Sequence, residues 1–231
     1  MQKSQFMSDT SSTRPYYVVP KCNQAVILRY IDHHLLVVEK PTYLLSVPGR
    51  EKENKDCVIT RVQTEFPSAC MVHRLDLDTS GLLIFALTPQ AQRHINRQFQ
   101  MRTIKKTYIA ELWGIIETEQ GKIDLPIAAD WENRPRQKIC ANGKASLTHY
   151  RVLHRDTSNY RTRVSLHPET GRSHQLRIHT KHIGHPILGC DLYAHDEALA
   201  ASPRLLLHAS ELILNHPITE QRIRIRSTAT F

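Results

Sequence analysis

Residues 73–87 read HRLDLDTSGLLIFAL, a polar turn that leads directly into a continuous apolar run. The run at residues 82–87 is short and bounded by glycine, which is typical of a strand buried on both faces. The turn before it carries Asp76 and Asp78 beside His73 and Arg74. A polar turn on a rigid strand is a favoured position for catalytic groups. Spacing alone, however, favours an ordinary capped loop with a salt bridge.

The segments around this run alternate between extended and helical patterns. Residues 35–38 predict another buried strand, and Asp56 is expected to cap a helix that ends before Pro67. Thr88 and Pro89 predict the start of a basic helix. Further strands are expected at residues 108–113, 148–153, 162–166, 205–208 and 223–225, and a helix at residues 175–183. The pattern predicts one domain of mixed helices and strands over residues 21–231, after a flexible tail at residues 1–20.

Composition indicates a polyanionic partner and a reducing compartment. Lys and Arg number 31 against 22 Asp and Glu, which gives a net charge of +9 and favours nucleic acid modestly. The five cysteines are odd in number and lack CxxC spacing, so neither a disulfide framework nor a cysteine zinc site is expected. No apolar run reaches the length of a membrane span, and the N-terminus lacks the apolar core of a signal peptide. We therefore expect a cytoplasmic protein.

Residues 73–81 resemble the HRLDxxTSG signature of the RluA-type pseudouridine synthase family. Further blocks follow in the family's order: Lys106-Thr107-Tyr108, residues 171–179 (GRSHQLRIH), residues 184–189 (GHPILG) and Leu207-His208-Ala209. Residues 46–50 (SVPGR) and 130–135 (DWENRP) resemble the short members of this family. The likeness runs from about residue 27 to residue 219, and we expect no S4 RNA-binding module of the kind that longer members often carry.

This resemblance implies an α+β fold, with one catalytic domain built around a mixed, largely antiparallel sheet with flanking helices. It also implies an isomerase that converts uridine to pseudouridine in RNA, without a cofactor or a metal. The family match assigns Asp76 as the catalytic carboxylate. It assigns Tyr108 as the aromatic ring that stacks on the target base, and Arg177 as the guanidinium that pairs with the carboxylate.

The resemblance further implies that the target uridine is flipped out of a folded RNA. Arg74 is a candidate to fill the vacated stack, although it fits a role in holding the turn equally well. Candidates for phosphate contacts are Lys105, Lys106, Arg134, Arg136 and Lys138. The implied substrates are a hairpin loop of 23S ribosomal RNA and the anticodon arm of transfer RNA. Small size and the lack of a spare apolar stripe favour a monomer.

Three features leave alternatives open. His179, His182 and His185 are spaced like metal ligands, but Gly184 should end the helix before His185, so a structural role is favoured. Cys190 stands where the family usually has Asp, and Asp191 follows it. Two other functions are less favoured. A non-catalytic RNA-binding protein would not need Asp76, Tyr108 and Arg177 together. A glycoside or nucleoside hydrolase would have to pair Asp76 with Asp78, and residues two apart on a turn are poorly placed to face one sugar from opposite sides.

Overall fold

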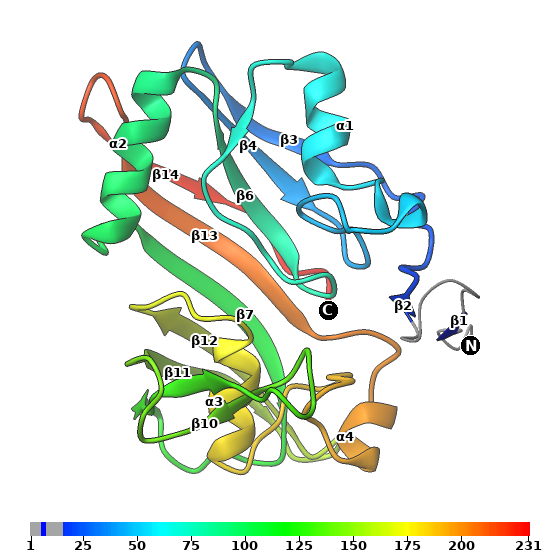
Figure 1. The fold of residues 1–231 in the computed structure, drawn as a ribbon. Coiled ribbons are helices and arrows are strands. Elements are labelled where there is room, and N and C mark those ends of the chain that lie inside the picture. Colours follow the sequence, from blue (N-terminus) through cyan, green and yellow to red (C-terminus); the bar gives the residue numbers. More distant parts are fainter. Residues whose placement is uncertain (1–5, 8–15) are drawn as a thin grey trace. The chain divides into compact units, whose positions relative to one another are not determined.

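The computed structural model describes residues 6–7 and 16–231 (Figure 1). The chain divides into two compact units, residues 1–93 and residues 94–231. Most of the predicted N-terminal tail lies outside the described residues. The described part of that segment includes two short antiparallel strands, β1 (Phe6–Met7) and β2 (Tyr16–Tyr17).

The first unit is built on a small antiparallel sheet. Strand β6 (Ser80–Ala86) lies between β4 (Leu35–Lys40) and β5 (Cys70–Met71), and β3 (Ile27–Ile31) pairs with the other edge of β4. Every residue of β6 is buried, as its unbroken apolar run predicted. The predictions of strands at residues 35–38 and 82–87 are confirmed.

Helix α1 (Val58–Glu65) forms where the apolar spacing predicted it, but its cap differs from the expectation. The N-cap residue is Cys57, whose backbone N–H donates to the Thr60 hydroxyl, so the predicted cap at Asp56 is wrong. Asp56 instead forms an ion pair with Arg61 at 2.6 Å, and this hydrogen-bonded guanidinium lowers the pKa of the carboxyl group. The helix starts at Val58 because its N–H bonds to the carbonyl of Leu45, which fixes the entry of the chain.

Two further helical segments occur before β7 (Lys105–Trp113), and the boundary between the two units falls within the second of them, α2 (Pro89–Gln100). Helix α2 begins as predicted, because the Thr88 hydroxyl accepts a hydrogen bond from the N–H of Ala91 at 3.2 Å. A short 3₁₀ turn, η1 (Lys52–Asn54), precedes α1.

The second unit contains a larger antiparallel sheet in the order β14-β13-β7-β12-β11-β8. Its strands are β7 (Lys105–Trp113), β8 (Gln120–Asp124), β11 (Leu147–Asp156), β12 (Arg161–Pro168), β13 (Leu207–Asn215) and β14 (Arg222–Arg226). A separate hairpin pairs β9 (Ile127–Ala129) with β10 (Gln137–Ile139). The helices are α3 (Gln175–His182) and α4 (Asp196–Ala200).

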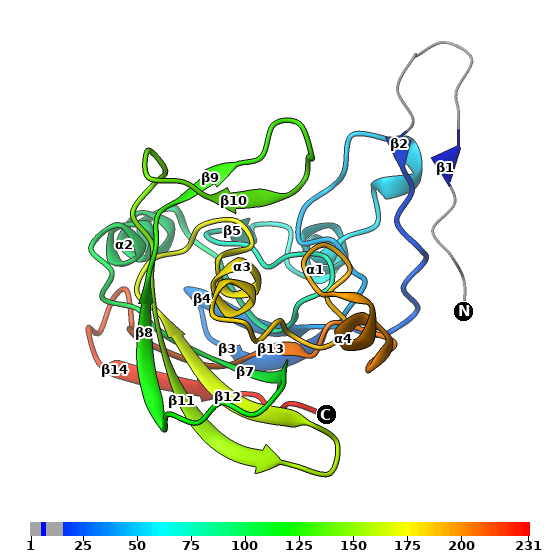
Figure 2. The same ribbon diagram turned by 90° about the horizontal axis from the view of Figure 1, so that it is seen from below.

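Helix α3 packs on one face of this sheet (Figure 2). Leu176 and Ile178 of the helix share a core with Leu112 of β7 and with Val164 and Leu166 of β12. The helix ends at His182, before Gly184, as predicted. These elements confirm the α+β class and the mixed, largely antiparallel sheet.

The five cysteines are all free in the structure. Among the described residues, no helix is both long enough and apolar enough to cross a membrane.

Candidate active site

The turn that carries Asp76 belongs to the first unit, and its backbone is fixed on the N-terminal side by Ser46. The buried Ser46 hydroxyl donates to the carbonyl of Leu75 at 2.7 Å and accepts from the N–H of Leu75 at 3.1 Å. The turn is closed by a hydrogen bond from the N–H of Thr79 to the carbonyl of Asp76. The Asp76 side chain remains half-buried.

Lys40 fixes the C-terminal side of the same turn. Its side chain is fully buried, and its ammonium donates at 2.8 Å to each of the carbonyls of Pro41, Leu44 and Leu77. Burying an ammonium costs several kcal/mol unless its donors are satisfied, and these three carbonyls accept from it. The register that pairs Lys40 with Gly81 brings the lysine beside the turn.

Two more side chains of this unit complete the support of the turn. The Thr42 hydroxyl donates to the carbonyl of Asp78 at 2.9 Å. The His73 ring accepts from the N–H of Ile84 through Nε2 at 2.9 Å. Arg74 is exposed. The turn is therefore held at consecutive peptides around Asp76, and the rigid placement that catalysis requires is present.

Sequence reasoning missed Lys40, Thr42 and Ser46 as parts of this site. The available signal was a lysine that ends an otherwise apolar strand. A charged side chain in that position is either solvated or paired, and the residues alone do not distinguish the two outcomes.

Arg177 lies in the second unit, on α3, and its side chain is 2% exposed. Its guanidinium donates through Nη2 to Asp191 Oδ1 at 2.5 Å and through Nε to Cys190 Sγ at 3.2 Å. The ring of Tyr193 lies 5.5 Å from the guanidinium carbon, within cation–π range. Cys190, which stands where the resemblance led us to expect Asp, and the adjacent Asp191 are therefore both direct contacts of Arg177.

Tyr108 belongs to the same unit as Arg177. It is half-buried on β7, opposite Leu166 of β12 and Ala209 of β13, and packs against the core that α3 also joins. The structure thus brings Tyr108 and Arg177 into one unit, on elements that share a core. Asp76 belongs to the other unit, so the convergence of the three residues stays a prediction.

Three of the candidate phosphate contacts lie together on the β9–β10 hairpin. Arg134 and Arg136 are exposed in its connecting loop, and Lys138 is exposed on β10, where it faces Asp130 at 3.7 Å. The two other candidates lie at the start of β7. Lys105 is exposed there.

Lys106 differs from the other basic candidates because it is half-buried. Its ammonium donates to the carbonyl of Thr170 at 3.1 Å, and burial lowers its pKa from 10.5 to about 8. Near neutral pH it therefore still carries most of its charge, but it loses that charge at a lower pH than a solvated lysine does.

The spaced histidines take unrelated partners. His179 is buried between the Thr148 hydroxyl (2.9 Å from Nδ1) and the carbonyl of Leu125 (3.1 Å from Nε2), and burial lowers its pKa below 6.5. His185 donates through Nδ1 to the carbonyl of Trp113 at 2.8 Å. In the part of the chain that the structure describes, no three His, Cys, Asp or Glu side chains gather as a metal site.

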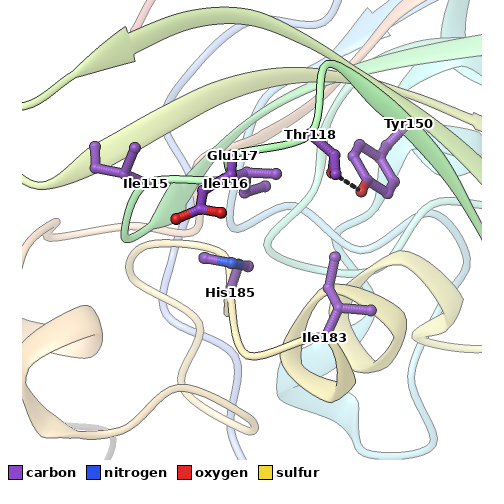
Figure 3. A pocket seen from close by; sticks show the side chains of 7 residues that line it. All are labelled: Ile115, Ile116, Glu117, Thr118, Tyr150, Ile183 and His185. Atoms are coloured by element: carbon purple, nitrogen blue, oxygen red, sulfur yellow. Dashed lines mark hydrogen bonds between the residues drawn. The ribbon is translucent and has the colours of Figure 1, made fainter.

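His185 also lines a cavity of about 390 Å³ in the second unit (Figure 3). Figure 3 shows Glu117 and His185 on opposite walls, and a hydrogen bond of 2.8 Å between the hydroxyls of Thr118 and Tyr150. The remaining lining residues are Ile115, Ile116 and Ile183. A cavity lined by isoleucines and one carboxylate is poorly suited to a polyanion.

Comparisons with known proteins agree on one family. A family model described as RNA pseudouridylate synthase matches residues 34–182. The chain is 55% identical over 193 residues to the dual-specificity RNA pseudouridine synthase RluA of Yersinia pestis, which covers 83% of this chain and 93% of that protein. The protein of the same name from Escherichia coli is 48% identical over 207 residues, or 89% and 94% of the two chains. The solved structure of human RNA pseudouridylate synthase domain containing 1 aligns with a TM-score of 0.75 at 29% identity, over 90% of this chain and 85% of that chain.

Proposed function

Because this chain belongs to the RNA pseudouridylate synthase family and is an isomerase that acts on RNA, we propose that Asp76 is the carboxylate with which it converts uridine to pseudouridine. The observation that carries this proposal is the support of the Asp76 turn. Buried Ser46 and Lys40 hold the peptides on its two sides. A reacting carboxylate gains from such rigid positioning, because little orientation entropy is left to lose in the reaction.

The chemistry requires little beyond this carboxylate. The C1′–N1 bond of uridine breaks, the uracil rotates, and a C1′–C5 bond forms while the proton at C5 is released. No redox change occurs and no external group is added. Asp76 is the group that acts at the sugar C1′ or at uracil C6, as a nucleophile or as an electrostatic and proton-transfer partner.

Tyr108 and Arg177 are proposed to serve the same reaction. Tyr108 stacks on the rotating uracil and assists removal of the C5 proton. Arg177, a buried guanidinium, orients the reacting carboxylate. If Asp76 and Arg177 act as a unit, the rate losses of Asp76→Asn and Arg177→Met will be strongly non-additive in a double-mutant cycle.

The central test compares Asp76→Asn with Asp78→Asn. RNA carrying tritium at C5 of uridine releases it when pseudouridine forms, and gel shift measures binding separately. We expect Asp76→Asn to abolish tritium release with little loss of RNA affinity, because Asn preserves the shape of Asp but not its charge. Asp78→Asn should retain most of the activity.

Other outcomes would favour the alternative functions. Near-normal tritium release by Asp76→Asn would refute the assignment of the carboxylate. Release of free uracil, lost equally in both variants, would indicate a hydrolase with paired carboxylates. Binding without any modification of the RNA would indicate a non-catalytic RNA-binding protein.

The substrates are proposed to be uridines in two RNA loops, one in 23S ribosomal RNA and one in the anticodon arm of transfer RNA. Support comes from relatives that are named dual-specificity enzymes. Recognition of two RNAs by one site suggests that loop shape is read together with sequence. Mapping pseudouridine in total RNA, from cells with and without this gene, identifies the sites directly.

The molecular context is proposed as a cytoplasmic monomer in which residues 21–231 are sufficient for activity. The free cysteines fit a reducing compartment. Removal of residues 1–20 should leave tritium release unchanged, and sedimentation at micromolar concentration should give the mass of one chain. An inactive truncation or a stable dimer would contradict these proposals.

A further inference from the structure

A second pocket of the larger unit, of about 500 Å³, lies between the β9–β10 hairpin and the turn at residues 171–173. Figure 2 shows the hairpin extending beside α3, and residues of β10 contact this helix. The side chains that matter here are Trp131, Gln137, Lys144 and Arg172. The proposed isomerisation does not use these side chains.

The walls of the pocket are fixed by the backbone. Ile127 and Lys144 exchange two backbone hydrogen bonds, at 3.0 and 2.8 Å. Gly143 lies so close to β9 that a Cβ atom at this position would be 2.6 Å from the carbonyl carbon of Ile127. On the other strand, the N–H of Gln137 donates to the Tyr193 hydroxyl at 2.8 Å. The pocket is therefore preformed, as ligand sites usually are.

Trp131 presents an unusually exposed aromatic surface at this pocket. Its side chain is 72% exposed, and the guanidinium carbon of Arg134 lies 4.8 Å from its ring centre. Proteins that bind unpaired nucleotides use aromatic platforms of this kind, because every base can stack on them, and a neighbouring arginine strengthens the contact.

The charge of the pocket matches a phosphate. Lys144 and Arg172 line it, and the residues recorded in its lining include no Asp or Glu. Two carboxylates flank Trp131 in the sequence: Asp130 is occupied by Asn133 at 3.0 Å and by Lys138 at 3.7 Å, and Glu132 is exposed and does not line the pocket. The cavity of Figure 3 differs, since its lining includes Glu117 and no Lys or Arg.

We propose that this pocket binds one unpaired nucleotide of the RNA substrate, with its base stacked on Trp131 and its phosphate held by Lys144 and Arg172. The side-chain amides of Gln137 and Asn142 provide donors and acceptors for the base edge. The inference rests on the proposed function for the identity of the polymer. It adds a nucleotide site outside the groups that perform the isomerisation.

The first test measures the fluorescence of Trp131. The chain has two tryptophans, so Trp113→Phe leaves Trp131 as the sole tryptophan, whose fluorescence is excited selectively over that of the tyrosines. In that background, titration with an anticodon stem-loop RNA should quench the fluorescence saturably. A blunt RNA duplex of equal length should quench far less, because it offers no unpaired base. Unchanged emission with the stem-loop, or equal quenching by the duplex, would overturn the proposal.

The second test uses affinity. Trp131→Ala should weaken stem-loop binding by about ten-fold or more, the usual loss for one stacked base. Trp131→Phe should restore most of the affinity, because the aromatic face is kept. Wild-type affinity in Trp131→Ala would refute the stacking role.

The third test addresses the phosphate. Lys144→Met and Arg172→Met should each reduce the slope of log affinity against log salt by about one unit. Lys122→Met removes the same charge from exposed strand β8 and serves as the matched control. Equal slopes in all three variants would show that the pocket residues contribute only general charge.

The failure of this inference is distinguishable from a failure of the proposed function. Binding is measured in the Asp76→Asn background, so that no product forms. If the wild-type chain formed pseudouridine but RNA did not quench Trp131, this inference would be refuted and the proposed function would not. Saturable quenching without pseudouridine formation would refute the function and leave the nucleotide site standing. A pocket that serves a protein partner would show no response to RNA in any of these assays.

Discussion

Asp191→Asn tests whether the ion pair between Asp191 and Arg177 orients the guanidinium for the proposed reaction. The resemblance led us to expect Asp where this chain has Cys190, and here the carboxylate of the next residue, Asp191, reaches the guanidinium at 2.5 Å. Asn preserves the shape and one oxygen acceptor but removes the charge. The substitution therefore isolates the electrostatic part of the contact.

The expected magnitude follows from the unequal burial of the two partners. Breaking a fully buried pair costs about 3–5 kcal/mol, whereas an exposed pair is worth about 0–1 kcal/mol. Arg177 is 2% exposed but Asp191 is 61% exposed, so solvent screens one side of the pair. We expect the free energy of unfolding to fall by about 1–2 kcal/mol. If the orientation of Arg177 is fully transmitted to the reaction, the rate falls roughly 5- to 30-fold.

The assay combines urea unfolding with single-turnover tritium release at saturating enzyme. Asp124→Asn is the matched control, because it removes an exposed carboxylate at the end of β8. Adding Cys190→Asp to Asp191→Asn should recover much of the lost rate, since Arg177 Nε lies 3.2 Å from Cys190 Sγ. If Asp191→Asn matched the Asp124→Asn control in stability and rate, the reasoning would be refuted.

Four further predictions concern the turn, two titrating groups and metal independence. Ser46→Ala leaves the buried N–H and carbonyl of Leu75 without their side-chain partner. We therefore expect the free energy of unfolding in urea to fall by about 1–3 kcal/mol, and kcat to fall with little change in KM. An unchanged kcat would contradict the role of the turn. Burial lowers the pKa of His179 in the folded chain, so the unfolded chain takes up the proton first and the free energy of unfolding should fall as the pH drops below about 6.5. His179→Gln should flatten this dependence, and an equal slope in the variant would exclude His179 as its source. If Lys106 contacts phosphate, the RNA affinity of the wild-type chain should decline as the pH rises through about 8. Lys106→Arg stays charged and should show no such decline. If affinity depended on pH in the same way in both proteins, Lys106 would not be part of the RNA interface. Dialysis against EDTA should leave the rate unchanged once the RNA is refolded without divalent ions, and a loss restored only by zinc would revive the histidine cluster.

Local chemistry alone predicted the elements whose signal lies within a few residues. The apolar run of β6 and the Thr88 cap of α2 were predictable for this reason, since burial pattern and capping are properties of neighbouring residues. The motif blocks likewise identified Asp76, Tyr108 and Arg177 as candidates by resemblance. The fold class followed from the same blocks.

Elements with a weak local signal were missed. Strand β3 is largely exposed, and β9 and β10 have three residues each. Their hydrogen bonds come from neighbouring strands. A segment of three residues is too short to show the alternating pattern that distinguishes a strand from a loop. The cap of α1 was misassigned by one residue, because the contact of Val58 with Leu45 decides where the helix begins.

The supports of the candidate site were decided by tertiary structure alone. The sequence does not show whether Lys40 is solvated or paired, but the register with β6 buries it against the carbonyl of Leu77, which is 37 positions away. The sequence shows only that Asp191 follows Cys190, whereas the structure places Arg177 of α3 within its reach. The sequence by itself determined which residue types are available to react. Only the tertiary structure decided which of them are desolvated and which have fixed hydrogen-bond partners, because both depend on groups that are distant along the chain.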